Sequence, residues 1–337
     1  MDKETLVKIF SYHNPERKDV TNKQYATRLY ALSRAFDDDT DEFLNEPEKV
    51  FDYLSQKAKT TYGNVLYSII GYLEAKDKDE LSKVYRTRKE HVDEQIANNY
   101  QKNKFFGHQE ENIISYSELV KFVERMDELV EKEDIASNAV YSNPESVMKE
   151  TKMVRLLLRL YLRFPSRNEY SSLKFISLVN YKKLVRIGGE KEDNFIVMKS
   201  QGNPMLSVAD YKTSKKYGVK VQEVDDKEVR LLLTKYYKEI GEEYLFTYTR
   251  SGKRWEKYYV SQMLSKWSKL VIGKNLGTTI IYKIIIQEAS KEYKRALDDD
   301  DFYTSDHWRL LLSKYSKSRG HSRAIQKAVY SKEESPV

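Results

Sequence analysis

One histidine and one tyrosine stand nine residues apart close to the C-terminal end of the sequence. The segment that carries His321 and Tyr330 reads S-R-G-H-S-R-A-I-Q-K-A-V-Y-S-K. An activated tyrosine hydroxyl can attack an electrophile and form a covalent intermediate, and a histidine can assist the proton transfer. The chain contains 27 tyrosines, so Tyr330 could equally be packed against the core. The spacing alone leaves both interpretations open.

Charge is distributed unevenly along the 337 residues. Residues 1–145 hold 21 Lys and Arg against 29 Asp and Glu, a net charge of −8, whereas residues 146–337 hold 38 against 23, a net charge of +15. A strongly basic region is typical of proteins that bind the phosphate backbone of nucleic acids. A lysine-rich solvated surface would give the same charge, so this observation favours nucleic acid binding without requiring it.

Composition excludes several kinds of site. The sequence has no cysteine, which rules out disulfides, thiolate metal sites and cysteine nucleophiles and suits an intracellular protein. With five histidines, a zinc site is a poor prediction, and the acidic run D-D-D-T-D-E at 37–42 lacks the turn glycine of a calcium loop. No signal peptide or membrane-spanning segment is recognisable. We therefore expect a soluble intracellular protein with no metal and no cofactor.

The N-terminal part is expected to be entirely helical. Four segments place apolar residues at three- and four-residue spacing, which predicts four or five short helices in a compact all-α domain over 1–140. These segments are 25–36, 49–57, 61–73 and 117–130. The segment E-D-I-A-S-N-A-V-Y-S-N-P, 133–144, interrupts the pattern with small and turn-forming residues and marks the domain boundary or a loop close to it.

The C-terminal part, 145–337, is predicted to combine helices with a small sheet. A long helix over 147–162 is stopped by Pro165. The period then changes to that of strands, which predicts an antiparallel sheet of two or three strands before helices return. The strands are 194–200, 205–214 and 218–224, and the later helices are 227–240, 260–270, 278–296 and 308 onward. The expected fold class is mainly α with a small antiparallel β-sheet.

Several motifs, in this order along the chain, resemble those of the tyrosine recombinases, nearest to the integrase-like group of giant viruses, virophages and Maverick/Polinton elements. F-P-S-R-N-E-Y at 164–170 is similar to that group's P-x-R-x-[DE]-Y signature, and D-Y-K-T-S-K-K-Y-G at 210–218 is similar to the strand with the catalytic lysine. H-Q-E-E-N-I-I-S-Y-S-E-L at 108–119 resembles the linker into the last helix of the core-binding domain. The resemblance implies a SAM-like core-binding domain followed by an α+β catalytic domain.

The resemblance also implies a role for each matched residue. Arg167 would hold the oxygens of a DNA phosphate with its planar fork of donors, although the R-x-x-E spacing of other tyrosine recombinases would select Ser166 instead. Lys212 would protonate the departing 5′ oxygen. His321 would contact the phosphate or assist proton transfer, and Tyr330 would form a 3′-phosphotyrosyl link. The basic residues expected to bind DNA are Lys174, Lys215, Lys216, Lys274, Arg319 and Arg323.

The second arginine of the family's pattern is absent. The pattern G-K-x-x-x-x-x-x-L-R-H corresponds here to G-K-N-L-G-T-T-I-I-Y-K, 273–283, so Tyr282 falls on the arginine position and Lys283, a candidate substitute, on its neighbour. Loss of one clamp on a charged transition state typically costs about 3 to 4 kcal/mol. If this were the only defect, Tyr282→Arg would raise cleavage.

Three functional hypotheses follow. The first is a DNA-binding tyrosine recombinase or integrase of viral or mobile-element origin, whose cleavage is weakened at position 282. The second is a catalytically inactive protein of the same fold that binds DNA or belongs to a virion, and the third is a helical protein–protein adaptor. The first two imply double-stranded DNA as the partner, tetramers on DNA by family analogy, no membrane, and a location in the nucleus, a viral factory or a virion.

Overall fold

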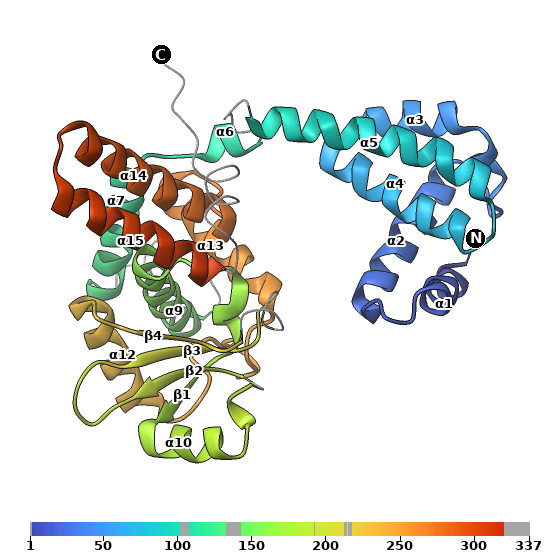
Figure 1. Cartoon of the computed structure of the whole chain (residues 1–337). Helices are drawn as coiled ribbons and strands as arrows, with labels where there is room; N and C mark the ends of the chain where they lie inside the picture. The colour runs from blue at the N-terminus through green and yellow to red at the C-terminus, as the bar shows by residue number, and fades with distance from the viewer. Residues whose placement is uncertain are drawn as a thin grey trace. The chain divides into compact units, whose positions relative to one another are not determined.

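The chain divides into two compact units, Met1–Lys102 and Asn103–Val337 (Figure 1). The computed structural model describes residues 2–101, 108–132, 143–191, 193–211, 214 and 218–319. Each unit has a hydrophobic core of its own. The prediction of a mainly helical chain with one small sheet is confirmed.

The first unit is helical throughout its described residues. Its elements are α1 (Lys3–His13), α2 (Asp19–Ala35), the 3-10 helix η1 (Glu42–Asn45), α3 (Pro47–Ser55), α4 (Lys59–Glu74) and α5 (Asp79–Gln101). Phe10, Leu29 and Leu66 lie fully buried in its core. The hydroxyl of Tyr85 in α5 donates a hydrogen bond to the carbonyl of Leu44 at 2.9 Å, so the longest helix of this unit is tied to η1. The three helices predicted before residue 74 are confirmed.

Helix α7 (Tyr116–Glu131) belongs to the second unit. The sequence pattern places it in the N-terminal domain. A capping box that begins at Ser115 starts this helix. Its apolar side chains, among them Phe122 and Met126, lie in the same core as those of α9 (Pro144–Arg163). A helix must bury its apolar stripe against a partner, and α7 finds that partner in α9. The compact units therefore separate between residues 102 and 103, ahead of the predicted boundary at 133–144.

The second unit contains the sheet and the remaining helices. Its further elements are α6 (His108–Asn112), η2 (Asn168–Ser172), β1 (Leu173–Ser177), α10 (Leu178–Arg186), η3 (Gly189–Lys191), β2 (Asn194–Met198), β3 (Met205–Val208), β4 (Lys220–Glu223), α12 (Lys227–Ile240), α13 (Lys257–Ile272), α14 (Thr278–Asp298) and α15 (Phe302–Arg319). The helices predicted after residue 226 are all present. None of the helices in the described ranges is long and apolar enough to cross a bilayer.

The sheet is mixed rather than antiparallel. Its strand order is β1-β2-β3-β4, with β1 parallel to β2 and the other two pairs antiparallel. The prediction missed β1, whose short sequence L-K-F-I-S reads ambiguously by period; α10 supplies the crossover that parallel neighbours require. Phe175 and Ile196 face the large helical core, whereas Ile176 and Phe195 pack with Tyr181 of α10 on the opposite face.

Helix α9 is the central helix of this unit. Leu156, Leu157, Leu158 and Leu160 are all at most 1% exposed, a pattern expected of a helix surrounded by protein on every side. It contacts α7, α12, α13 and α14. The helix ends just before Phe164, since the residue that precedes a proline is disfavoured in the helical region. The segment with the predicted first arginine therefore begins at the end of a rigid, buried element.

Candidate active site

The turn that carries Arg167 is fixed by two tyrosines. Arg167 is the residue before η2, with φ −88° and ψ −136°. The hydroxyl of Tyr161 in α9 donates to the carbonyl of Arg167, and the hydroxyl of Tyr170 donates to the carbonyl of Phe164. Burial raises the pKa of both hydroxyls well above the usual value, so they remain protonated donors. The backbone on either side of the arginine is thus held from within the unit.

The guanidinium of Arg167 forms no ion pair with Glu169, the acidic residue two positions later. Glu169 is 5% exposed and accepts a hydrogen bond from Oγ of Ser166 at 2.8 Å. The half-buried side chain of Arg167 makes no hydrogen bond or ion pair with residues in the described part of the chain. Its guanidinium therefore keeps its donors for another partner.

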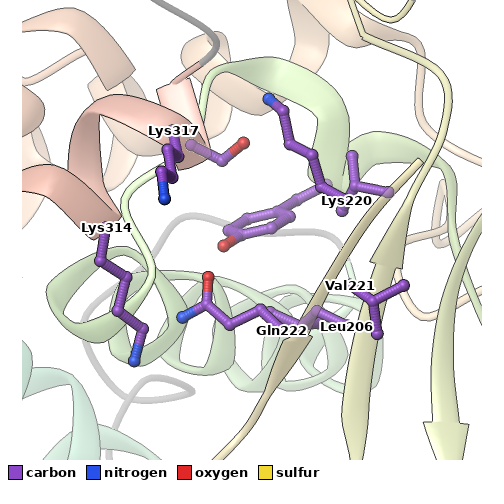
Figure 2. A pocket seen from close by; sticks show the side chains of 9 residues that line it. Leu206, Lys220, Val221, Gln222, Lys314 and Lys317 are labelled. Atoms are coloured by element: carbon purple, nitrogen blue, oxygen red, sulfur yellow. The ribbon is translucent and has the colours of Figure 1, made fainter. Parts of the chain in front are cut away.

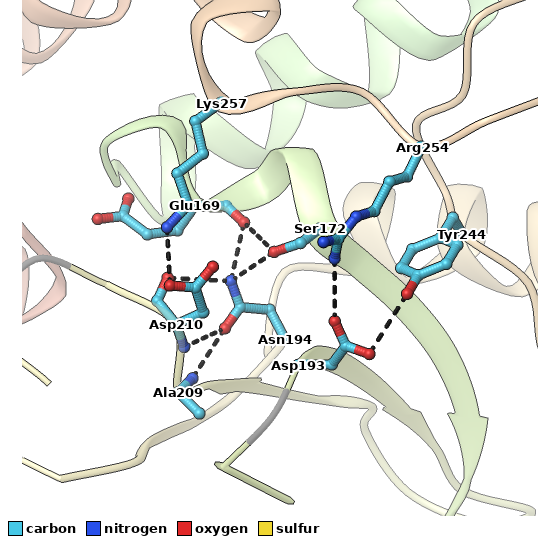
Figure 3. Close-up of polar contacts among 9 residues, drawn as sticks. All are labelled: Glu169, Ser172, Asp193, Asn194, Ala209, Asp210, Tyr244, Arg254 and Lys257. Atoms are coloured by element: carbon cyan, nitrogen blue, oxygen red, sulfur yellow. Dashed lines mark hydrogen bonds and ion pairs between the residues drawn. The ribbon is translucent and has the colours of Figure 1, made fainter. Parts of the chain in front are cut away.

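Asn194, the first residue of β2, joins this turn to the end of β3. Its side-chain nitrogen donates to the carbonyl of Glu169 and to Oγ of Ser172, both at 2.9 Å. Its side-chain oxygen accepts from the backbone N–H groups of Ala209 and Asp210, both at 2.8 Å (Figure 3). The residue is 0% exposed, and a buried amide whose groups are all paired is a rigid anchor. The chain that leaves β3 therefore starts at a fixed place beside the turn.

Further contacts support the same region from the side of residues 244–257. Lys257 forms an ion pair with Asp210 at 2.7 Å. Asp193 accepts from Arg254 at 3.2 Å and from the hydroxyl of Tyr244 at 3.3 Å (Figure 3). These partly exposed pairs contribute little each, about 0 to 1 kcal/mol. They tie Asp193 and Asp210, which flank the Asn194 network, to residues 244–257.

A lysine from the next strand lies close to Arg167. Lys220 opens β4, and its Nζ lies 3.4 Å from the centre of the Tyr211 ring, a favourable cation–π contact. Burial lowers the pKa of Lys220 to about 8; the negative charge of Glu169 acts in the opposite direction, and the positive charge of Arg167 adds to the lowering. The charges of Arg167 and Lys220 are therefore close enough to influence each other.

A cavity of about 280 Å³ opens beside the turn. Ser166 lines it from the turn, Lys220 and Gln222 from β4, and Lys314 and Lys317 from α15 (Figure 2). The side-chain nitrogen of Gln222 is buried with no hydrogen-bond acceptor among the described residues. Three cationic side chains and an unused amide donor suit a phosphate group, whose oxygens only accept. The cavity is thus a candidate phosphate site.

Position 282 is part of the core, and a different arginine covers it. Tyr282 of α14 is 0% exposed, and the guanidinium carbon of Arg319, the last residue of α15, lies 4.4 Å from its ring centre. Arg319 donates from Nη1 to the carbonyl of Ser166, and its Nη2 lies 3.5 Å from Oγ1 of Thr279. We predicted Arg319 as a DNA contact, but at 3% exposure its guanidinium is bound inside the protein. It joins α15 to the turn with Arg167.

Three other predicted residues are engaged elsewhere. Lys283, the candidate substitute for the second arginine, is 5% exposed within α14 and already has a partner. Lys274 donates from Nζ to the carbonyl of Glu111 at 2.8 Å. Lys174 lies with Nζ 5.7 Å from the ring centre of Tyr244. The DNA contacts of Lys174 and Lys274 stay predictions.

The remaining predicted residues lie outside the described part of the chain. They are Lys212, Lys215, Lys216, His321, Arg323 and Tyr330. Their roles stay predictions. Their neighbours in sequence are described: Tyr211 precedes Lys212 and is held beside Lys220, and Arg319, two residues before His321, is bound to the turn.

Sequence reasoning did not pick out Asn194, Lys220, Lys314 or Lys317. The only signal for Asn194 was a polar residue placed directly before the apolar run F-I-V-M. The lysines stand out only after β4 and α15 are placed on opposite sides of one cavity. Among the described residues, no group of three histidine or carboxylate side chains is placed to hold a metal ion.

Comparison with known proteins yields a structural likeness only. No family model matches the chain, and no curated protein matches it in sequence. Seven chains of solved structures match. One of them is the crystal structure of XerA recombinase, with 13% sequence identity and a TM-score of 0.37 over 97% of this chain and 93% of that chain. The chemistry of the site has to be argued from this chain's own residues.

Proposed function

We propose that this chain is a tyrosine recombinase, which binds double-stranded DNA and cleaves and rejoins its strands through a 3′-phosphotyrosyl intermediate at Tyr330. The observation that carries the proposal is that Arg167, which makes no hydrogen bond or ion pair with the described residues, follows directly after Ser166, which lines the lysine-lined cavity of about 280 Å³. The end of α15 is bound to the same turn through Arg319. The chain reaches His321 two residues later and Tyr330 nine residues after that.

The chemistry needs cations because negative charge accumulates on the non-bridging oxygens of the phosphate during attack. Arg167 holds two of these oxygens with its fork of donors. The hydroxyl of Tyr330 gives its proton to His321 and attacks phosphorus, the bond to the 5′ oxygen breaks, and a proton donor neutralises that oxygen. The phosphotyrosyl bond conserves the energy of the broken phosphodiester, so rejoining requires no external energy source.

A second observation, in the first unit, supports DNA binding. Arg17 and Arg28 place their guanidinium carbons 4.8 and 5.8 Å from the ring centre of Tyr25, and Nζ of Lys89 lies 5.3 Å from that of Tyr67. We call these five residues the Tyr25 patch. Four of them, all but Arg17, line a hollow of about 380 Å³. Cations grouped with aromatic rings suit a nucleic acid backbone, although the first 145 residues are acidic as a whole.

The motif P-x-R-x-[DE]-Y at 165–170 places the chain, within this proposal, nearest to the integrase-like group of giant viruses, virophages and Maverick/Polinton elements. Integration of a mobile element is then its biological reaction. Tetramers on two duplexes follow by analogy with that family, and so does a location in the nucleus, a viral factory or a virion.

One observation favours a second candidate function, a DNA-binding protein of this fold that does not cleave. Tyr282, at the position of the second arginine, is fully buried under Arg319. The guanidinium of Arg319 already donates hydrogen bonds to the carbonyl of Ser166 and to Oγ1 of Thr279. If no other cation completes the clamp, the phosphate would be bound without being cleaved.

A suicide-substrate assay separates the two candidates. Nicked duplexes of randomised sequence, labelled at one end, trap a covalent complex because the fragment downstream of the cleavage diffuses away. We expect a protein–DNA adduct stable to SDS with the wild type and with Tyr303→Phe, a matched control because Tyr303 is 86% exposed. Tyr330→Phe should give none.

Two results would contradict the proposal. An adduct that persists in Tyr330→Phe would assign the nucleophile to another residue. Retained DNA binding with no adduct from the wild type would establish the non-cleaving alternative.

A further inference from the structure

Lys220 differs from the other lysines around the cavity in how firmly its ammonium group is placed. Its Nζ rests 3.4 Å from the ring centre of Tyr211, whereas Lys317 is exposed and Lys314 lies 3.7 Å from Asp225. Solvated lysines move among many rotamers, and each lost rotamer carries an entropy cost. A lysine stacked on a buried ring has already lost that freedom.

The ring beneath Lys220 is itself anchored. Tyr211 is 5% exposed, and its hydroxyl donates to the carbonyl of Gly218 at 2.7 Å. The residue before it, Asp210, is held by Asn194 through its backbone N–H. Asn194 also binds the turn that carries Arg167. A continuous set of hydrogen bonds therefore sets the distance between Lys220 and that turn.

The environment of Lys220 disfavours its charge without removing it. Burial lowers its pKa to about 8, Glu169 opposes the change, and Arg167 adds to it. A proton donor works best when its pKa lies near the operating pH, since it then holds a proton and releases it readily. An ordinary lysine, with a pKa of 10.5, gives up its proton less easily.

We propose that Lys220 is the proton donor to the departing 5′ oxygen of the DNA strand, acting on the phosphate that Arg167 holds. The inference rests on the proposed function and assigns this step to β4 rather than to Lys212. Oη of Tyr330 gives its proton to His321 as its bond to phosphorus forms; the bond to the 5′ oxygen breaks, and Nζ transfers one proton to that oxygen and becomes a neutral amine. In rejoining, the amine takes a proton from the attacking 5′ hydroxyl, and His321 returns a proton to the departing oxygen of Tyr330.

Sulfur substitution at the 5′ bridging position tests this step. A thiolate leaves without protonation because its conjugate acid is far stronger than an alcohol, so a missing proton donor no longer matters. The probes are two nicked duplexes of one sequence, selected from the randomised pool by the wild type, with oxygen or sulfur at the scissile position. The readout is the rate of covalent adduct formation by the full chain.

Lys220→Met and Lys220→Arg should slow the oxygen substrate by about 10²-fold or more, with a near wild-type rate on the sulfur substrate. Arginine keeps the charge but cannot release a proton, so it separates proton donation from electrostatic binding. Lys235→Met, an exposed residue of α12, should leave both rates unchanged. The wild-type rate on oxygen should fall as pH rises through about 8 and stay level on sulfur.

Several outcomes would overturn the inference. Sulfur rescue in Lys212→Met with none in the Lys220 variants would return the role to Lys212. If Lys220→Arg slows adduct formation equally on both substrates, Lys220 has a structural role. A lowered thermal denaturation midpoint of that variant, measured in parallel, would show the same. If the wild type forms no adduct with either substrate, the proposed function itself fails, and this result differs from a failure of Lys220 alone.

Discussion

The guanidinium of Arg319 lies 4.4 Å from the ring centre of Tyr282, and both side chains are buried. The same guanidinium donates to the carbonyl of Ser166. The cation next to the turn with Arg167 therefore comes from α15, and α14 contributes the aromatic surface on which it rests. An aromatic ring at position 282 is what this arrangement uses.

This contact reverses the expectation for Tyr282→Arg. A second guanidinium at position 282 would lie against Arg319 in a buried site, where an unpaired charge costs about 3 to 5 kcal/mol. We expect a loss of that order in the free energy of unfolding, measured by urea denaturation, and no gain in cleavage. Tyr282→Phe, which keeps the ring, should stay within about 1 kcal/mol of the wild type.

The paired exchange Tyr282→Arg with Arg319→Tyr is the companion test. It restores one cation and one ring, so we expect it to be more stable than the sum of its single changes by about 1 kcal/mol or more. Full stability of Tyr282→Arg alone would show that the two side chains are not coupled.

Asn194 should protect two specific amide hydrogens from exchange. Its side-chain oxygen accepts from Ala209 and Asp210, and Asn194→Asp keeps that oxygen whereas Asn194→Ala removes it. We expect hydrogen exchange at both amides to rise in the alanine variant and to rise less in the aspartate variant. Asn45→Asp, at an exposed position of the first unit, is the control.

A second expectation for these variants concerns stability. Asn194→Asp leaves the Glu169 carbonyl without its donor and buries a carboxylate, which should cost about 1 to 3 kcal/mol. If exchange at Ala209 and Asp210 is the same in all variants, Asn194 does not anchor the end of β3.

The lowered pKa of Lys220 predicts a dependence of stability on pH. The group titrates at about 8 in the folded chain against an ordinary value of 10.5, so between these values the unfolded chain binds more protons. Stability from this group therefore rises with pH across that window and is lowest below it. The free energy of unfolding of the wild type minus that of Lys220→Met should increase from pH 7.5 to 10.

Urea denaturation at several pH values measures this difference, with Lys235→Met as the control that should show a flat line. A flat line for Lys220→Met as well would mean that Lys220 keeps an ordinary pKa. It would also weaken the case for proton donation by this residue.

The Tyr25 patch should contribute to DNA affinity. Arg28→Glu and Lys89→Glu each remove one phosphate contact and add repulsion, so we expect weaker binding to any duplex and a salt dependence reduced by about one unit of slope. Lys83→Glu, at an exposed position of α5, should have a smaller effect. Filter binding or anisotropy over a range of salt concentrations gives both quantities, and equal effects of all three changes would leave the patch without a special role.

The helical elements could be predicted because their apolar spacing decides which face is buried. Residues 227–240 were expected as one helix and form α12 with those bounds. Strand β1 could not be predicted in the same way, because its pairing with β2 depends on a crossover through α10 and not on its own pattern. The packing of α7 on α9 could not be predicted either, because a stripe of apolar residues on a helix does not identify the element that covers it.

The candidate site was predictable only in part, for a related reason. Arg167 belongs to a local motif, and its neighbour Ser166 lines the cavity; the catalytic role of Arg167 stays a prediction. Lys220 and Asn194 belong to no local motif, because their environment is made by strands that meet in three dimensions. Arg319 was read as a surface cation, since its burial depends on Tyr282, which stands 37 positions earlier in the sequence.

The turn from Phe164 to Glu169 accepts hydrogen bonds from side chains that lie far apart in the sequence and are therefore synthesised at different times. Tyr161 is already present when the turn emerges, Asn194 follows soon after, and Arg319 comes 153 residues after Ser166. A nascent or truncated chain that ends before α15 therefore lacks the last support of the turn, as well as His321 and Tyr330. The turn has all three of these hydrogen bonds only once α15 has been made and packed, so a chain cut before α15 would hold the backbone around Arg167 less firmly.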